Sequence, residues 1–216
     1  MKTRTLFAIC FFTGIILAGC GAGAPVNTST PVNTATPVNT ATPVYTPTPR
    51  NTTTADLTNV SLKTEDLPIG FHLFTEDEIK SIGWDLTQIT TAFGGGANLV
   101  KTDLYGKNLQ TVEFFIDAFF YPLSSELIDK LDKGFLNPEI LIQSMNGITV
   151  LTNLSGIGNG SMGMTQIVQG IKMNFLMIRR NNTLILMFEV YQSETSPFDL
   201  KAIGQKMDQY VLAKYK

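Results

Sequence analysis

The stretch KMNFLMIRR-NN-TLILMFEVYQ, residues 172–192, contains two apolar runs separated by two asparagines. The runs are rich in branched, aromatic and long apolar residues, which is typical of strands that pack in a core. Asn181-Asn182 predicts a tight turn, because asparagine tolerates the positive φ that such turns require. Together with the apolar run at residues 164–168, the stretch predicts three consecutive antiparallel strands, a β-meander. Its strands are expected at Met164–Val168, Lys172–Arg180 and Thr183–Gln192.

Upstream of the meander, turn residues divide the chain into short strands and helices. Gly106-Lys107-Asn108 joins two apolar runs, and Pro122 ends the second of them. Ser124 is placed to cap a helix in which Leu127, Leu131 and Phe135 recur at four-residue spacing. The predicted strands are Phe71–Phe74, Ala97–Tyr105, Leu109–Tyr121 and Ile148–Leu154, and the other predicted helices are Glu76–Ser81, Leu86–Phe93 and Pro138–Met145.

The strand predicted at Leu109–Tyr121 has two different faces. The alternate residues Val112, Phe114, Ile116, Ala118 and Phe120 share an apolar face. Glu113 and Asp117 mark the opposite face, which we expect to be partly solvated although Phe115 and Phe119 share it.

The last helix is predicted from Ser196-Pro197-Phe198-Asp199, with Ser196 as its N-cap and Pro197 at its first position. Its buried stripe is expected to be Leu200, Ile203, Met207 and Val211. Together these patterns predict an α+β fold. About seven mostly antiparallel strands form a sheet with helices packed on it, a sandwich rather than an alternating βαβ fold.

The first 20 residues have the features of an export signal. Lys2 and Arg4 precede 15 uncharged residues, 5–19, and small residues follow. This run is shorter than the roughly 20 apolar residues that cross a membrane. Its end, Leu17-Ala18-Gly19-Cys20, resembles the lipobox of the bacterial lipoprotein family. The resemblance implies cleavage between Gly19 and Cys20, removal of residues 1–19 and lipidation of Cys20. A plain secretory signal is the alternative.

The lipoprotein resemblance also implies where the protein resides. One acyl chain holds a protein only marginally, whereas the family's diacylglyceryl cysteine, which carries fatty chains such as palmitate, provides two. We therefore expect a lipid anchor in the bacterial cell envelope, with the domain outside the cytoplasm. Cys10 lies in the segment to be removed, so the domain would have no disulfide and would depend on core burial.

Residues 20–55 form a repeat. The pattern Pro-Val-(Asn/Tyr)-Thr recurs four times with a period of six residues, beginning at Pro25, and six of the ten prolines of the chain lie here. Proline removes backbone donors, and the sparse apolar content cannot offset the entropy lost on ordering. We interpret the segment as a disordered Thr/Pro-rich tether that would span roughly 100 Å if extended. A Pro-rich docking peptide is the alternative, and O-glycosylation is left open.

Residues 56–216 have the length of one globular domain. All 18 acidic residues lie here against 13 lysines and arginines, so the domain has a net charge of −5. This charge argues against binding to nucleic acid and against electrostatic adhesion to an anionic bilayer.

The domain also resembles a known fold family. Asp66-Leu67-Pro68-Ile69-Gly70-Phe71, Gly156-Ile157-Gly158-Asn159-Gly160 and the order of the predicted elements are similar to Mog1/PsbP-like domains of exported bacterial lipoproteins. Asn159 stands where those proteins often have an acidic residue. The resemblance spans residues 56–216 and implies a binding or accessory module.

The sequence contains no clear catalytic, cofactor-binding or metal-binding motif. His72 is the only histidine, so a His-based metal cluster is excluded and a Ser-His-Asp triad would depend on this ring. We expect His72 to be a half-exposed structural residue. The Gly156–Gly163 run lacks the spacing of a phosphate-binding loop and is expected to be mobile.

Several other groups have both a structural and a functional interpretation. Acids in a first helical turn are stabilising without a metal, and methionine packs well in cores, so the structural interpretation is favoured for each group. The functional interpretation differs for each group. Glu76-Asp77-Glu78 with Asp85 could bind calcium, and Met173, Met177 and Met187 could bind copper. Arg179-Arg180 could bind an anionic group, and Trp84 could line a pocket.

We therefore predict a membrane-anchored, monomeric envelope lipoprotein. Its domain would be a non-enzymatic module that binds a protein partner or a small ligand and needs no cofactor. One alternative is a hydrolase or transferase that uses carboxylates such as Asp85, Asp103 or Glu113. The other is a purely structural envelope protein.

Overall fold

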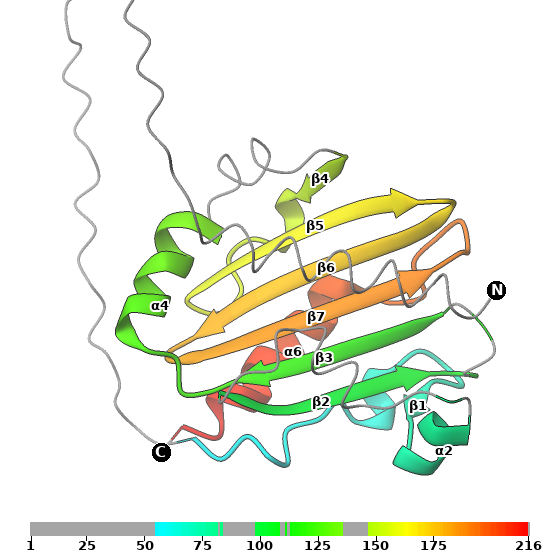
Figure 1. Ribbon diagram of the computed structural model, residues 1–216, viewed down its shortest axis with the longest axis horizontal. Coiled ribbons are helices and arrows are strands. Elements are labelled where there is room, and N and C mark those ends of the chain that lie inside the picture. The colour runs from blue at the N-terminus through cyan, green and yellow to red at the C-terminus, as the bar shows by residue number, and fades with distance from the viewer. Residues whose placement is uncertain are drawn as a thin grey trace, which may run out of the picture.

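A computed structural model shows a seven-stranded, wholly antiparallel sheet with helices beside it (Figure 1). The α+β fold class predicted from the sequence is therefore confirmed. The structure describes residues 55–81, 83, 98–108, 111, 113–135 and 147–215.

The strand order is β1-β2-β3-β7-β6-β5-β4. The meander β5-β6-β7 forms as predicted, with Asn181 in the left-handed region at φ 52°. The next strand along the chain after β3 is β4, and it lies at the far edge, whereas β7 returns to pair with β3. The strands are β1 (His72–Leu73), β2 (Leu99–Gly106), β3 (Phe114–Phe120), β4 (Ile148–Leu151), β5 (Gly160–Val168), β6 (Ile171–Arg180) and β7 (Thr183–Tyr191).

The helices in the described ranges are short, except for the last one. They are η1 (Thr64–Asp66), α2 (Glu76–Ser81), α4 (Ser125–Lys130), the π-helical turn η2 (Leu131–Phe135), η3 (Thr152–Leu154) and α6 (Leu200–Leu212). Ser124 caps α4 as predicted, since its side chain accepts a hydrogen bond from the Leu127 amide at 3.2 Å. Of the residues at four-residue spacing, Leu131 is buried but Leu127 is exposed, and its neighbour Ile128 is buried in the core.

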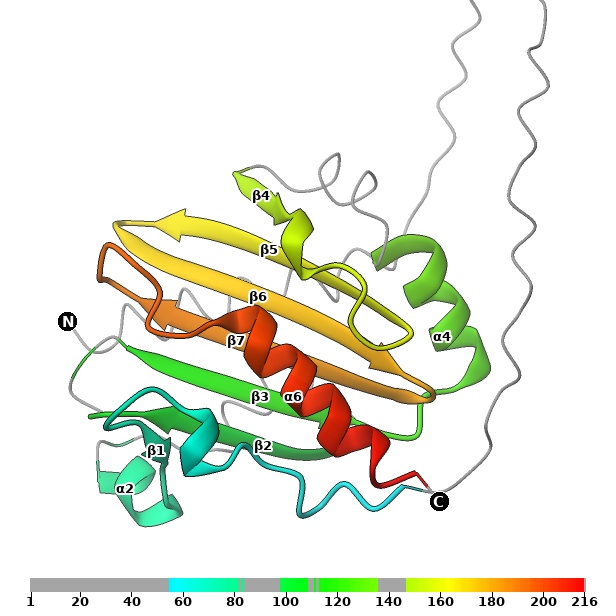
Figure 2. The same ribbon diagram turned by 180° about the vertical axis from the view of Figure 1, so that it is seen from behind.

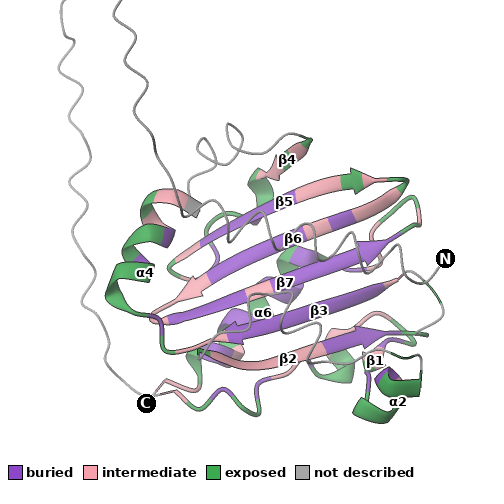
Figure 3. Cartoon of the chain, in the orientation of Figure 1, coloured by how far each residue is buried: buried purple, intermediate pink, exposed green. Residues whose placement is uncertain are grey.

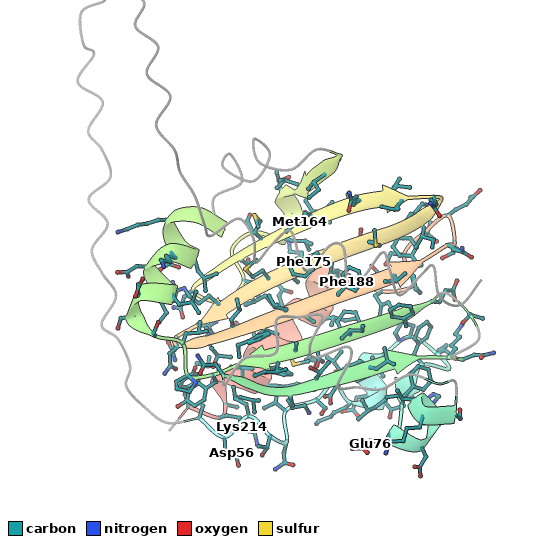
Figure 4. The ribbon with its side chains drawn as sticks, in the orientation of Figure 1. Asp56, Glu76, Met164, Phe175, Phe188 and Lys214 are labelled. Carbon is teal, nitrogen blue, oxygen red and sulfur yellow. The ribbon has the colours of Figure 1, made fainter. Side chains whose placement is uncertain are left out.

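Both faces of the sheet are apolar, and the central strands are buried along most of their length (Figure 3). On one face, Met164, Phe175 and Phe188 lie in a row across β5, β6 and β7, because they are direct register partners (Figure 4). On the other face lies α6 (Figure 2), with its predicted stripe fully packed. The buried stripe is Leu200, Ile203, Met207 and Val211.

The predicted start of α6 is wrong, because the helix begins at Leu200: Ser196 is not its N-cap and Pro197 is not at its first position. Asp199 is the N-cap, because its side chain accepts a hydrogen bond from the Ala202 amide at 3.0 Å. Ser196 turns away from the helix and donates its hydroxyl proton to Glu189 on β7. Glu189, seven residues earlier on β7, therefore binds the residue that local spacing assigns to the cap.

The first described residues, 55–63, form an extended segment that we call the N-terminal arm. Ala55 bridges to Tyr215 beside the end of α6, and its amide donates to the Tyr121 hydroxyl at 3.0 Å. Asp56 and Lys214 lie at this same corner (Figure 4). From there the arm runs along β2 on the side of the sheet that carries α6 (Figure 2).

Three sets of predictions lie outside the described residues. They are the signal peptide with Gly19 and Cys20, the tether except its last residue, and the helices Leu86–Phe93 and Pro138–Met145.

Candidate functional site

Asp117 is a fully buried carboxylic acid on the face of the sheet that carries α6. It lies at the centre of β3 between Phe115 and Phe119, and its exposed fraction is 0%. Neither of its oxygens has a hydrogen-bond partner among the described residues. The expectation of a partly solvated face is therefore wrong. Buried polar groups are nearly always partnered, so this carboxyl is an exception that needs an explanation.

Asp103 on β2 is the register partner of Asp117, and their side chains lie on the same face. Direct cross-strand partners have Cβ atoms roughly 5 Å apart. In contrast to Asp117, Asp103 has both hydrogen-bond partners and an ion-pair partner. Its Oδ2 accepts hydrogen bonds from Ser61 Oγ at 2.7 Å and from the Tyr105 hydroxyl at 3.1 Å, and it pairs with Lys101 Nζ at 2.7 Å.

The N-terminal arm packs against the polar groups of β2 beside Asp117. Lys101 Nζ also donates to Ser61 Oγ at 2.6 Å, and the Leu62 amide donates to the Tyr105 hydroxyl at 3.1 Å. Leu57, Val60 and Leu62 of the arm are buried in the same apolar cluster as Phe115 and Phe119. The site is therefore a set of polar groups on β2 and β3. The arm that lies against it forms no backbone hydrogen-bond ladder with these strands.

Burial raises the pKa of Asp117 well above its ordinary value, because an anion there would lose its hydration. The negative charge of Asp103 raises it further, and Lys101, the Tyr105 hydroxyl and the Asp103 backbone oppose the rise only in part. Burial and the same two carboxyls also raise the pKa of the Tyr105 hydroxyl. The raised pKa favours the protonated, neutral form of the buried Asp117 carboxyl.

The carboxyl pair bears on the hydrolase alternative. Asp103 and Asp117 converge, and the pKa of one of them is shifted, as such an enzyme requires. However, Asp117 has no exposed surface, and the side chains of Asp103 and Lys101 are only 12% and 15% exposed. Of the other proposed acids, Glu113 lies half-buried before β3 and Asp85 lies outside the described residues. A substrate therefore cannot reach this pair while the arm is closed.

Glu189 on β7 is a second buried acid on this face, with 0% exposure. Burial raises its pKa, although hydrogen bonds from Ser196 and Asn174 oppose the shift. Asn174 Nδ2 donates to Glu189 Oε2 at 2.8 Å, and the Ser196 hydroxyl binds Oε1. Glu189 therefore has the partners that Asp117 lacks, and it holds the loop before α6 against the sheet.

Arg179 and Arg180 are not a solvated turn, and neither is open to an external anion. Arg179 Nε donates to Asp132 Oδ1 at 2.7 Å. Arg180 makes two hydrogen bonds to Asp208 on α6, one of them from Nε at 2.7 Å. The two arginines attach η2 and α6 to the end of β6.

His72 is half-buried, as expected, and its Nε2 lies 3.2 Å from Glu78 Oε1. Glu78 also accepts hydrogen bonds from the Thr75 amide and hydroxyl, and Glu76 pairs with Lys80. The acids at the start of α2 are thus used within the domain. No group of three or more potential metal-ligating side chains occurs among the described residues.

The glycine-rich loop before β5, residues 156–159, is held in place by hydrogen bonds. The Asn159 amide donates to the Arg179 carbonyl at 2.7 Å, and Asn159 Oδ1 accepts from the Asn181 amide at 2.6 Å. Gly158 has φ +68°, and a Cβ there would lie 2.5 Å from the Arg179 carbonyl oxygen. The expectation of a mobile loop is therefore wrong, because the loop is packed against β6.

The methionines lie in the two apolar clusters, where thioethers pack against aromatic and branched side chains. Met173 and Met177 lie on the face of Phe175, and Met187 lies on the face of Asp117. The structural interpretation is therefore the better one for all three. Trp84 lies outside the described residues.

A family model described as a Schizosaccharomyces pombe repeat of unknown function (DUF963) matches residues 22–55. The match lies within the segment that we interpret as a tether, and it carries no information about the domain. The comparison with curated proteins finds no match for this chain. In the described part of the chain, no helix has both the length and the apolar composition needed to cross a bilayer.

Proposed function

We propose that this chain is a lipid-anchored, extracytoplasmic lipoprotein whose domain is a non-enzymatic module that binds an envelope protein or a small ligand. The observation that carries the proposal is Leu17-Ala18-Gly19-Cys20, which follows a 15-residue uncharged run with basic residues before it. No other motif in the chain is as specific.

The domain supports this proposal in two ways. The chain enters it at a corner, where Ala55 bridges to Tyr215, while β1 and α2 lie at the other end (Figure 1). A connection at one corner leaves the remaining surface available to a partner. In addition, Asp117 and Glu189 have no exposed surface, which favours a binding role over carboxylate catalysis.

The lipid anchor is tested by comparing Cys20→Ala with the matched control Cys10→Ala in cells supplied with a fatty acid that carries a clickable alkyne. We expect the wild type and Cys10→Ala to incorporate the label, to fractionate with membranes and to begin at residue 20 by intact mass. Cys20→Ala should lose the label and keep residues 1–19. Equal labelling of both variants, or a mature chain that begins elsewhere, would refute the anchor.

The binding role is tested by native mass spectrometry of the full chain, released from membranes in mild detergent. A specific adduct of constant mass, lost after mild unfolding and recovered when the same compound or protein is added back, supports the module. A bare monomer that remains bare after incubation with envelope extract counts against it.

A further inference from the structure

The N-terminal arm is held differently from the rest of the domain. The strands beneath it are fixed by backbone ladders, whereas the arm has regular backbone pairing only at Ala55. Beside Asp117 it is held by three apolar side chains, by Ser61 on Asp103 and Lys101, and by the Leu62 amide on Tyr105. Segments with few backbone bonds open at lower free energy than ladders do.

The charged and titratable groups around Asp117 come from several elements. From β2, the groups facing it are Asp103, Lys101 and Tyr105. From β7, Met187 lies directly opposite and Glu189 is its diagonal neighbour.

The arm and α6 bring no free charge to this site. Between Leu57 and Leu62 the arm has no titratable side chain. The ionisable groups of α6 near the sheet have partners elsewhere: Asp208 binds Arg180, and Tyr210 and Lys206 bind Asp66. Lys101 is the only cation in the set around Asp117, and it is already shared by Asp103 and Ser61.

We propose that Asp117 and the N-terminal arm form a proton-operated clasp: the arm closes over the protonated carboxyl and opens when the carboxyl loses its proton. An ionised Asp117 would place a second anion directly across the strand pair from Asp103. Neither of its oxygens has a hydrogen bond of normal geometry among the described residues, and the nearby Tyr105 hydroxyl and Asp103 backbone offset the effect of burial only in part. The new anion requires water, and the arm can move aside without breaking a backbone ladder between strands. Opening would expose Leu57, Val60 and Leu62.

The sign of the pH dependence follows from the direction of the shift. The pKa of Asp117 is raised in the closed state. The closed state therefore binds the proton more tightly than the open state, and the arm is held most firmly below the ordinary pKa of an aspartate. It opens as the pH rises through the raised pKa. One proton is released per opening, so the opening equilibrium changes up to about tenfold per pH unit.

The experiment is hydrogen–deuterium exchange of the full-length chain over a pH series, with each rate divided by its intrinsic value at that pH. The reporter is the Leu62 amide, which donates to the Tyr105 hydroxyl. We expect its protection to be constant at low pH and then to fall up to about tenfold per pH unit, while the amides of β6 and β7 keep theirs. In Asp117→Asn the fall should disappear, and in the matched control Glu113→Gln it should persist.

Infrared spectroscopy of the wild type gives a second test that does not depend on a variant. A band from a protonated carboxyl should persist above the ordinary pKa of an aspartate and should disappear as the pH rises further and the Leu62 amide loses protection. A fall in protection that is identical in Asp117→Asn, or arm protection that is constant while the carboxyl band titrates, would overturn the clasp. Because none of these readouts depends on Cys20, failure of the lipid anchor and failure of the clasp are distinguishable.

Discussion

Replacing Asp117 by leucine should make the domain more stable. Both carboxyl oxygens are buried without a partner, and the side chain is surrounded by Phe115, Phe119 and Met187. A buried unsatisfied polar group costs about 1–3 kcal/mol, and leucine removes that cost with a side chain of similar length. The pair of Asp103 and Lys101 remains intact in this variant. We therefore expect a gain of about 1–3 kcal/mol in the free energy of unfolding.

The assay is urea unfolding of wild type and variant at pH 5 and at pH 8, supported by thermal scans. Each kcal/mol should raise Tm by about 2–4 °C for a domain of this size. Because the pKa of Asp117 is raised in the folded state, the wild type is most stable below the ordinary pKa of an aspartate. Its stability then falls as the pH rises toward the folded value. Asp117→Leu lacks this fall, so the gain should be larger at pH 8.

A matched control is Asp77→Leu, which places the same new side chain at an exposed position of α2. Its effect should stay within about 0.5 kcal/mol. A loss of more than about 1 kcal/mol in Asp117→Leu would mean that the carboxyl has a stabilising partner, and the argument from its isolation would fail. The same conclusion would follow from a gain that is equal at both pH values.

Two further predictions concern the attachments of β6. Asp208→Ala leaves Arg180 largely buried without its carboxylate, and should cost about 2–4 kcal/mol in urea unfolding, with α6 losing amide protection first. A cost below about 0.5 kcal/mol would show that water replaces the carboxylate. Gly158→Ala should cost about 1–3 kcal/mol, because its Cβ would meet the Arg179 carbonyl oxygen and its φ is +68°. Gly156→Ala, with φ +82° and open space around it, should cost less, and equal costs would contradict the role of the contact.

The meander and the helix stripes could be predicted because their signals are local. In β6 and β7, apolar runs and two turn residues determine the pairing by themselves, and the hairpin forms with Asn181 at positive φ. The stripe from Leu200 to Val211 follows from helical spacing alone, so it was predicted residue by residue. In these elements, local preference and long-range packing agree.

The site could not be predicted, because its cover comes from a distant part of the chain. Alternation in β3 correctly separates the faces of Ile116 and Asp117, but it cannot show that the arm closes over the second face. A charged residue among aromatic ones was interpreted as a sign of solvent, whereas Ser61 and Leu62 lie over Asp103 and Tyr105, more than 40 residues later in the chain. The one available signal was an acid flanked by phenylalanines at every second position.

Polar side chains of the sheet hold in place the segments that form no backbone hydrogen-bond ladder with it. Asp103 holds the arm through Ser61, Glu189 holds the loop before α6 through Ser196, and Arg180 holds α6 through Asp208. Apolar packing is not directional, so hydrogen bonds of this kind specify where such segments lie.

Asp117 does not hold any segment in this way, because neither of its oxygens makes a hydrogen bond of normal geometry among the described residues. A positioning role requires a hydrogen bond, and stability alone would favour an apolar side chain at this position. The property that separates Asp117 from Asp103 and Glu189 is its capacity to change charge beneath a cover that can open. If Asp117→Leu is more stable and its arm no longer responds to pH, the carboxyl has been retained at a cost in stability for that response.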